Sequence, residues 1–424
     1  MKVAAITNVT DHVLEIATRA RGAARLVGRL TPEVKEQALL CLAALLRARA
    51  SFIGRENQKD LRSGEKNSLS RALLDRLRLN ETRIEAMAEA VEQIAAAVDP
   101  VGEVVSQWTR PGGFEVGQVR IPLGVVGIIY ESRPNVTADA SALCFKAGNA
   151  AILRGGSEAI HSNLAIGRCI REAFEQTGVT PDAVQLIETT SREAVGALLK
   201  MDSFVDVIIP RGGKALIQRV VEESLIPVIK HFEGICHTFI HREADPEMAI
   251  PIVINAKVQR PGTCNALETL LIDAPIADSF VPRVVAELRH HGVLIRGCPR
   301  TVALAQVDQQ AVEDDYRREY LSLECNVRVV DDLESATQHI ADFGSRHTDV
   351  IVTESYAAAR AFVRRVDSSS VMVNASSRLA DGGVYGLGAE IGISTDKLHA
   401  FGPMGVRELT TKKFVVYGHG AVRE

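Results

Sequence analysis

The sequence predicts an α/β fold with two parallel-sheet domains and a small antiparallel β unit. Short apolar segments alternate with helical segments over residues 125–232, and the alternation resumes over residues 237–376. Residues 104–124 carry two alternating runs around Pro111-Gly112-Gly113. Alternating strands and helices are typical of βαβ units and parallel sheets. Two alternating runs joined by a Gly-rich turn are typical of a β-hairpin.

The first hundred residues read as helices. In "TPEVKEQALLCLAALLRARA", Thr31 is the predicted N-cap, Pro32 the first helical residue, and the apolar positions recur at helical spacing. A second helix is expected over residues 80–98, ending near Asp99 and Pro100. The hairpin that follows separates these helices from the next unit, so we expect it to extend from the body and pair with another subunit.

From residue 125 onward, the expected strands and helices alternate as follows: strands at 125–132, 150–156, 183–188, 205–213 and 226–232, and helices at 136–148, 162–178, 191–201 and 214–224. Ligands of parallel sheets bind at the carboxyl ends of the strands. A second set of alternating segments over residues 237–376 predicts a second α/β domain. Residues 410–420 read as an isolated strand that pairs with the hairpin.

Composition argues against several classes of protein. The 424 residues are 46% hydrophobic, which is enough for two or more cores, and the formal net charge is −4 with no basic run that would bind nucleic acid. The start lacks the apolar core of a signal peptide, and no stretch is long enough to span a membrane. The seven cysteines are odd in number and lack CxxC spacing, so we expect a reduced, cytoplasmic protein without a zinc site or other metal.

Cys264 stands apart from the other cysteines. It lies in "VQRPGTCNALETLLID" between a predicted helix and a predicted strand, beside Gly262 and Thr263. A thiolate there can attack an activated carbonyl, and its own backbone N–H can stabilise the oxyanion that forms. The alternative is a loop cysteine without a chemical role. The other cysteines suit structural roles in apolar segments, apart from Cys298 beside Pro299.

Two glycine turns follow predicted strands that could neighbour each other. The first is Arg154-Gly155-Gly156-Ser157 and the second is Arg211-Gly212-Gly213. Such turns at helix N-termini present N–H groups to phosphate, so the pair suggests a dinucleotide site. Neither is GxGxxG, and an ordinary strand-to-helix turn explains each of them equally well.

Several polar residues are further candidates. Asn135 can donate its amide to an oxyanion or act as a helix N-cap. Arg378 can bind a carboxylate or phosphate, although a solvated loop arginine is the ordinary case. His237, His347 and His399 are candidate bases or anion donors, although core or surface histidines are commoner.

Taken in order, Asn135, Arg154, Arg211-Gly212-Gly213, Cys264 and Glu319 resemble the aldehyde dehydrogenase superfamily. The resemblance covers essentially the whole chain and is strongest in "AGNAAILRGGSEAIHSN", "VQRPGTCNALETLL" and "GLGAEIGISTDKLHAFGPMGVRELTTKKFVVYGHG". It implies two Rossmann-like parallel-sheet domains and a small β oligomerisation flap. The implied ranges are 1–101 with 122–233 for the NADPH-binding domain, 234–390 for the catalytic domain, and 102–121 with 405–424 for the flap.

Within the superfamily, the chain resembles the stand-alone reductases of an acyl phosphate. That resemblance implies that NADPH reduces L-glutamyl 5-phosphate to L-glutamate 5-semialdehyde with release of phosphate, in the second step of proline biosynthesis. Cys264 would form the thioester, and Asn135 and the Cys264 N–H would hold the oxyanion. Glu319 aligns with the residue that binds the nicotinamide ribose.

Two departures from the wider superfamily are informative. Where many members carry Lys-Pro-x-Glu, this chain has Arg154-Gly155-Gly156-Ser157, which removes an acid and favours NADPH over NADH. The Glu that activates water in other members has no secure counterpart in "HFEGICHTFI", even at Glu233. Loss of that base suits an enzyme whose thioester must be protected from water.

Position along the chain suggests the substrate contacts, and the resemblance implies an oligomer. Arg378, then Arg133, are the preferred contacts for the substrate's anionic groups, and Asp381 for its amino group. A homo-oligomer, as a dimer or tetramer, and an association with glutamate 5-kinase are also expected. The rival hypotheses are an oxidising or CoA-acylating aldehyde dehydrogenase and a catalytically inactive, nucleotide-binding scaffold.

Overall fold

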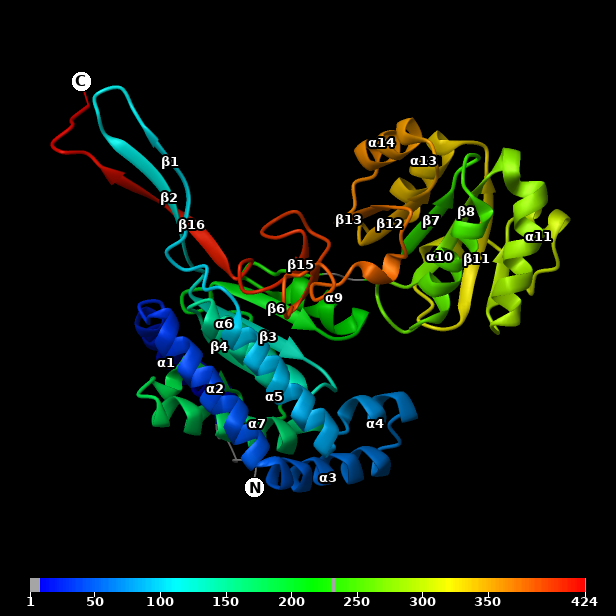
Figure 1. Ribbon diagram of the computed structural model, residues 1–424. Coiled ribbons are helices and arrows are strands. Elements are labelled where there is room, and N and C mark those ends of the chain that lie inside the picture. Colours follow the sequence, from blue (N-terminus) through cyan, green and yellow to red (C-terminus); the bar gives the residue numbers. More distant parts are fainter. Residues whose placement is uncertain (1–7, 231–232, 424) are drawn as a thin grey trace. The chain divides into compact units, whose positions relative to one another are not determined.

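The computed structural model describes residues 8–230 and 233–423, which form two compact units (Figure 1). The first unit contains the described residues up to Lys230, Leu387–Gly392 and the described residues from Met404 onward. The second unit contains the described residues from 233 to Gly386 and also Ile393–Pro403. The predicted α/β class, with two parallel sheets and one small antiparallel sheet, is confirmed.

Helices dominate the start of the first unit. They are α1 (Val9–Val27), α2 (Pro32–Ala48), α3 (Ala50–Lys66), α4 (Arg71–Leu77) and α5 (Glu81–Ala96). Thr31 is the N-cap of α2 and Pro32 is its first residue, as predicted, although the Thr31 side chain makes no capping hydrogen bond. Among the described helices, none is long and apolar enough to cross a membrane alone. Of these described helices, only α2 and α3 taken together have the length and composition of a membrane span, and their axes are bent by 69° relative to each other.

The four-stranded parallel sheet of the first unit has the order β5-β4-β3-β6. Its strands are β3 (Val125–Tyr130), β4 (Ala150–Gly155), β5 (Val184–Leu186) and β6 (Val207–Arg211). The helices that connect or follow them are α6 (Asn135–Lys146), α7 (Ile160–Gln176), α8 (Glu193–Leu198) and α9 (Lys214–Glu223), with 3₁₀ turns at Ser157–Ala159 and Pro181–Ala183. Residues of β3 and β4 are buried throughout, as expected for strands covered by helices on both faces.

One strand prediction for this unit is wrong in its extent. Residues 226–232 were expected to form a strand, but their described part makes only an isolated parallel bridge between Ile208 and Val228. The last two residues of that range lie outside the described residues.

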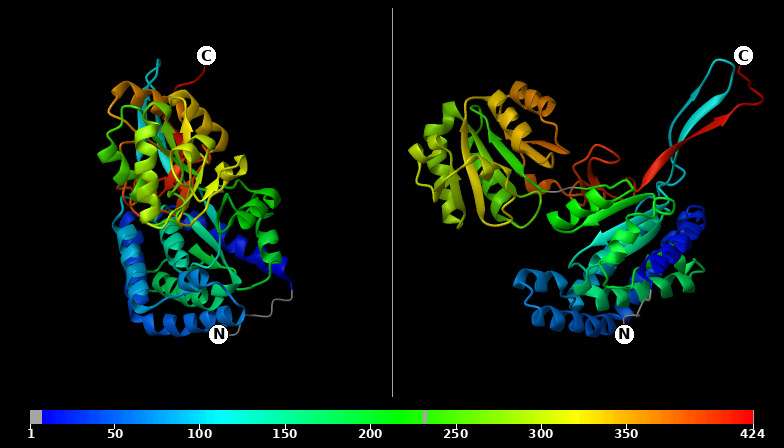
Figure 2. Two further views of the ribbon diagram at one scale, coloured as in Figure 1. Left: turned by 90° about the vertical axis from the view of Figure 1, so that its right-hand side faces the viewer. Right: turned by 180° about the vertical axis from the view of Figure 1, so that it is seen from behind.

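The hairpin and the chain's last strand form one antiparallel sheet, which we call the flap. Its strands are β1 (Val104–Thr109), β2 (Glu115–Pro122) and β16 (Thr410–Tyr417), in the order β1-β2-β16. They lie side by side in Figure 1 and in the right-hand view of Figure 2. The predicted pairing of the tail with the hairpin is therefore confirmed. The flap is largely exposed, including Trp108 and Phe414, whose rings meet edge to face at 6.4 Å.

The second unit is built on a seven-stranded parallel sheet with the order β10-β9-β11-β8-β7-β12-β13. The strands are β7 (Cys236–Ile240), β8 (Leu267–Asp273), β9 (Leu294–Gly297), β10 (Gln309–Gln310), β11 (Glu324–Val330), β12 (Thr348–Val352) and β13 (Ser370–Val373). The helices are α10 (Pro246–Val258), α11 (Ala274–His290), α12 (Pro299–Leu304), α13 (Leu333–Phe343) and α14 (Tyr356–Arg365). Short 3₁₀ turns lie at Glu313–Arg317 and Ser377–Leu379, and β14 (Gly392–Ser394) pairs with β15 (Gly402–Met404).

Successive residues of the central strands face opposite sides of this sheet. Phe239 packs in a core with Ile340 and Phe362, whereas the next residue, Ile240, packs in a core with Val253 of α10. The sheet is therefore covered on both faces, and its strands read as continuous apolar runs. β9, α12 and β10 were not predicted because they are short and carry little periodicity.

Candidate active site

Three turns of the first unit meet at the carboxyl edge of its sheet. They follow β3, β4 and β6 and carry the candidates Asn135, Arg154 to Ser157, and Arg211 to Gly213. Parallel strands bring these turns to one edge because their carboxyl ends all point the same way. The expectation that the two glycine turns lie on neighbouring strands is wrong, since β3 lies between β4 and β6.

Asn135 is the first residue of α6, and Pro134 is its N-cap, so the alternative that Asn135 caps this helix is excluded. The Asn135 side chain is exposed, and its Nδ2 donates to Asp139 Oδ2 at 2.9 Å. Burial raises the pKa of Asp139 to about 6, and the hydrogen bond from Asn135 opposes that shift. Asp139 Oδ1 is also buried and has no hydrogen-bond partner among the described residues.

Arg154 is buried, and backbone carbonyls hold its guanidinium. Nη1 donates to the Gly155 oxygen at 2.9 Å, and Nη2 donates to the oxygens of Thr190 and Ser191, both at 3.3 Å. Burial lowers the pKa of Arg154 below its usual range. The guanidinium therefore braces the turns after β4 and β5.

The glycines of both turns allow close packing. A Cβ on Gly155 would lie 2.1 Å from Asn163 Nδ2, and one on Gly212 would lie 2.4 Å from Glu131 Oε2. Both distances are far below van der Waals contact, so a larger residue would force the Asn163 side chain or the Glu131 side chain to move. Gly213 faces open space, but its N–H donates to Glu131 Oε2 at 3.0 Å. A carboxylate thus already caps an N–H at the start of α9 that was predicted to face phosphate.

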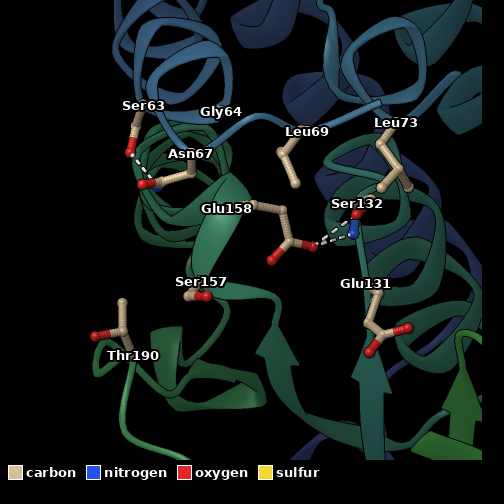
Figure 3. Close-up of a pocket in the computed structure, with 10 residues that line it drawn as sticks. All are labelled: Ser63, Gly64, Asn67, Leu69, Leu73, Glu131, Ser132, Ser157, Glu158 and Thr190. Carbon is tan, nitrogen blue, oxygen red and sulfur yellow. Dashed lines mark hydrogen bonds between the residues drawn. The ribbon is translucent and has the colours of Figure 1, made fainter. Parts of the chain in front are cut away.

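A pocket of about 570 Å³ lies beside the turns after β3 and β4 (Figure 3). Glu158 lies within it and accepts from the Ser132 N–H at 2.6 Å and from Ser132 Oγ at 2.8 Å. Ser132 has a φ of 46°, in the left-handed region, and these two hydrogen bonds hold it there. Among the described residues, the lining contains two acidic side chains and no Lys, Arg or His. The lining residues are Ser63, Gly64, Asn67, Leu69, Leu73, Glu131, Ser132, Ser157, Glu158 and Thr190.

In the second unit, Cys264 lies in the turns between α10 and β8, half-buried. Cys41 is also half-buried, and the other five cysteines are buried. Thr263 Oγ1 donates to the Arg260 oxygen at 2.9 Å, and the Asn265 Nδ2 donates to the Ala380 oxygen at 2.9 Å. The residues on either side of Cys264 are thus tied into the fold, which fixes the backbone that carries the thiol.

The Cys264 loop lies at the amino end of its strand, and the start of β7 packs closely against it. β7 and β8 are neighbouring parallel strands in which Cys236 pairs with Leu267, so the residues preceding each strand meet at one edge. A Cβ on Gly234 would lie 1.8 Å from the Cys264 carbonyl oxygen. Cys236 Sγ donates to that same oxygen at 3.2 Å. The carboxyl-edge rule therefore describes the candidates of the first unit but not Cys264.

Glu319 reaches the same edge of the sheet, before β11. Its Oε1 accepts from the Gly234 N–H at 2.9 Å. Beneath it, Glu268 and Lys257 form an ion pair of 2.8 Å in which both side chains are 0% exposed. Glu268 Oε1 also accepts from the Leu321 N–H at 3.4 Å, two residues beyond Glu319. Burial raises the pKa of Glu268 to about 7, against the attraction of Lys257.

Arg378 lies beside the Cys264 loop. It contacts Asn265 Oδ1 through Nη1, and its Nε donates to Gln259 Oε1 at 2.9 Å. Asp381 Oδ1 accepts from the N–H groups of Gly383 at 2.9 Å and Val384 at 3.2 Å, so this carboxylate caps a turn. Arg133 is exposed in the first unit, after β3.

The histidine candidates differ in their surroundings. His237 is fully buried and its Nδ1 lies 2.8 Å from Asp349 Oδ1. His347 is buried with Nδ1 2.8 Å from Thr348 Oγ1 and 3.8 Å from Cys236 Sγ, whereas His399 is exposed. Within residues 8–230 and 233–423 there is no group of three or more His, Cys, Asp or Glu that could hold a metal ion.

Sequence reasoning missed Gly234, Cys236, Asp139 and the Lys257–Glu268 pair. The one available signal was a charge inside an apolar run, at Glu268 in "NALETLLID" and Lys257 in "IVINAKV". A charge at such a position must be paired when the segment is buried. Gly234 and Asp139 carry no comparable local signal.

The comparisons with known proteins agree with this architecture. A sequence model described as "Aldehyde dehydrogenase family" matches residues 2–313. The chain is 52% identical over 416 residues to the gamma-glutamyl phosphate reductase of Desulfatibacillum aliphaticivorans and 53% identical over 417 residues to that of Moorella thermoacetica. Each alignment covers 98% of this chain and 100% of the relative.

Solved structures extend the comparison. The crystal structure of gamma-glutamyl phosphate reductase from Thermotoga maritima has a TM-score of 0.95 at 44% identity, covering 97% of this chain and 100% of that chain. An acetylating aldehyde dehydrogenase from Geobacillus thermoglucosidasius, at 18% identity and a TM-score of 0.69, shares the fold and covers 98% of each chain. The chain therefore belongs to the aldehyde dehydrogenase family, among its gamma-glutamyl phosphate reductases, and is an oxidoreductase.

Proposed function

We propose that this protein reduces L-glutamyl 5-phosphate to L-glutamate 5-semialdehyde with NADPH and releases phosphate, the second step of proline biosynthesis. The observation that carries the proposal is more than half identity, over the full length, to relatives named for reduction of that acyl phosphate. The half-buried Cys264, on a loop fixed on both sides, supports the same chemistry.

Cys264 is the nucleophile in this proposal. Its sulfur attacks the acyl carbon, the bond from that carbon to the phosphate oxygen breaks, and phosphate leaves with the electron pair, which yields a thioester. After reduction, the thiohemiacetal collapses, the carbon–sulfur bond breaks, and the aldehyde leaves. The leaving phosphate needs no base to remove a proton, which suits a site where the water-activating Glu of other members has no secure counterpart.

The oxyanion in both tetrahedral species requires donors. Asn135 Nδ2 and the Cys264 backbone N–H are our candidates. Removing one oxyanion donor from an enzyme typically raises the activation free energy by roughly 3 kcal/mol, so each of these donors should stabilise the transition state by about that amount. The Asn135 nitrogen carries two N–H groups, of which Asp139 takes one. The second is available to a substrate oxygen.

A nicotinamide dinucleotide fits the carboxyl edge of the first unit's sheet. Gly213 is open at the start of the ten-residue helix α9, where phosphate is favoured. We assign Arg154, Gly155, Gly156 and Ser157, the Arg211-Gly212-Gly213 turn, and Glu319 to cofactor binding. When bound, NADPH supplies the hydride that reduces the thioester. Phosphate at α9 requires the exposed Glu131 to release the Gly213 N–H.

For the substrate, we assign Arg378 to a carboxylate or phosphate, because its guanidinium is held beside Asn265, the residue after Cys264. Arg133 is the second candidate anion contact. Asp381 is assigned to the amino group with less support, since its Oδ1 already caps a turn.

The test is NADP+ reduction by the purified protein with glutamate 5-semialdehyde, with and without inorganic phosphate. We expect activity that depends on phosphate and that Cys264→Ala abolishes. The matched control is Cys41→Ala, which removes the other half-buried thiol and should leave the rate unchanged. An acid product formed without phosphate would support the rival oxidising dehydrogenase, and full activity in Cys264→Ala would exclude this nucleophile.

We further propose that the flap joins copies of this chain, because both of its outer strands, β1 and β16, have unpaired edges in the described sheet and carry exposed apolar residues. Phe414, at 64% exposed, is the residue to change. Phe414→Glu should lower the mass measured by light scattering if the flap is the interface. Association with glutamate 5-kinase and a cytoplasmic location stay predictions.

A further inference from the structure

We propose that Asp139 is a positioning residue that fixes which end of the Asn135 amide faces the reacting oxygen. The inference rests on the proposed function, since it assumes that Asn135 is an oxyanion donor. It adds a residue, one helical turn away, to which no role was assigned from the sequence.

The geometry carries the argument. Asn135 begins α6, Asp139 lies four residues later on the same helical face, and Nδ2 lies 2.9 Å from Oδ2. An ionised carboxylate only accepts hydrogen bonds, so it selects the amide nitrogen and turns the amide oxygen away. An amide flip changes the shape of the side chain very little, but it would present an oxygen to the developing negative charge. The carboxylate excludes that flipped state.

A purely structural role explains the position less well. An Asn–Asp pair at this spacing stabilises an exposed helix by only about 0.2–0.5 kcal/mol. The Asp139 side chain is partly buried, and its Oδ1 is buried without a hydrogen-bond partner among the described residues. Burial also raises the pKa of this carboxyl. A buried carboxylate oxygen without a partner costs stability, so a purely structural role does not account for an acid at this position.

The experiment is a double-mutant cycle between the two positions. Asp139→Leu removes the acceptor while keeping a side chain of similar size, and Asp139→Asn keeps an acceptor oxygen without charge. Rates are measured as NADP+ reduction with glutamate 5-semialdehyde and phosphate in the wild type, Asn135→Ala, both Asp139 variants and the double variant Asn135→Ala/Asp139→Leu. Alkylation of Cys264 by iodoacetamide is followed in parallel as a measure of an intact nucleophile.

We expect Asp139→Leu to lower kcat by about 10- to 100-fold, because removing this acceptor releases the rotamer of the Asn135 side chain as well as the orientation of its amide. The expected loss is a fraction of the roughly 100- to 1,000-fold loss of a whole oxyanion donor. The KM for NADP+ and the alkylation rate should not change. Asp139→Asn should lose about two-fold, because its own amide can turn either way and half of the molecules keep the correct orientation. When Asn135 is already alanine, adding Asp139→Leu should lower kcat by less than about two-fold.

Three results would overturn the proposal: unchanged kcat in Asp139→Leu, an equal loss from Asp139→Leu with and without Asn135, or full activity in Asn135→Ala. The last result would remove only the donor role, whereas phosphate-independent activity or an active Cys264→Ala would contradict the proposed function itself. Should Asp139→Leu fail to fold, Asp139→Ala removes the same acceptor and is judged by the same criteria.

Discussion

Replacing Gly234 with alanine should displace the backbone of Cys264, the proposed nucleophile. Gly234 precedes β7, and its N–H donates to Glu319 Oε1 at 2.9 Å. A Cβ at this position would lie 1.8 Å from the Cys264 carbonyl oxygen, 2.5 Å from its carbonyl carbon and 2.6 Å from its Cα. All three contacts are with backbone atoms, so no side chain can rotate to relieve them.

The magnitude follows from these distances. To reach ordinary van der Waals contact, the new Cβ and the Cys264 oxygen must move apart by about 1.6 Å. Thr263 and Asn265 are hydrogen-bonded to Arg260 and Ala380, so the loop can move only by breaking these contacts or shifting Gly234 away from Glu319. A misplacement of about 1 Å costs on the order of 100-fold in rate. Overpacking of this kind also lowers the free energy of unfolding by about 1–3 kcal/mol.

The assay is phosphate-dependent NADP+ reduction together with thermal unfolding. We expect Gly234→Ala to lose at least about 100-fold in kcat while remaining folded. The matched control is Gly54→Ala in α3, where a Cβ meets nothing within 4 Å. That change should leave kcat unaltered and stabilise the helix by up to about 1 kcal/mol. A Gly234→Ala enzyme within three-fold of wild type would refute the reasoning.

Three further predictions concern carboxylates that are buried, as Glu268 is, or partly buried, as Asp139 and Glu158 are. Lys257→Met should lower the free energy of unfolding by about 3–5 kcal/mol in urea titrations, because it leaves the buried Glu268 without its cation. The double variant Lys257→Met/Glu268→Leu should recover most of this loss. A double variant whose loss is the sum of the two single losses would contradict the prediction. The folded state raises the pKa of Asp139 to about 6, so its protonated form contributes stability at low pH that is lost as the pH rises through 6. Asp139→Asn stays neutral at every pH. Its free energy of unfolding should therefore exceed that of the wild type by at most about 3 kcal/mol above pH 7, and should equal it at pH 3. Glu158→Leu should cost about 1–3 kcal/mol by leaving the Ser132 N–H without its acceptor, and an unchanged melting temperature would exclude that role.

The periodic parts of the fold were predictable from the sequence. Helices such as α2 and α5 and the strands β3, β4, β8 and β12 lie where periodicity placed them, because both signals arise from neighbouring residues. β9, β10 and α12 were missed because segments this short carry too few residues to show a period. Residues 226–232 failed as a strand because an apolar run also suits a buried connection.

For the site, local context was sufficient to propose Cys264, and its role as nucleophile stays a prediction. A thiol after Pro-Gly-Thr, between a helix and a strand, is unusual enough to identify before any contact is known. Arg154 shows the limit of this reasoning, since its position after a strand was predictable but its hydrogen bonds to Thr190 and Ser191 were not. Those partners belong to a separate strand end, which only the strand order brings close.

The sequence by itself thus determined the α/β class and the flap and singled out Cys264 as the candidate nucleophile, because each depends on residue types within a short window. Tertiary structure alone decided the strand order that places β3 between the glycine turns, and the placement of Gly234 against Cys264. It also decided which carboxylates are buried, as at Glu268. Contacts between residues far apart in the chain arise from packing over the whole core, and no local pattern records them.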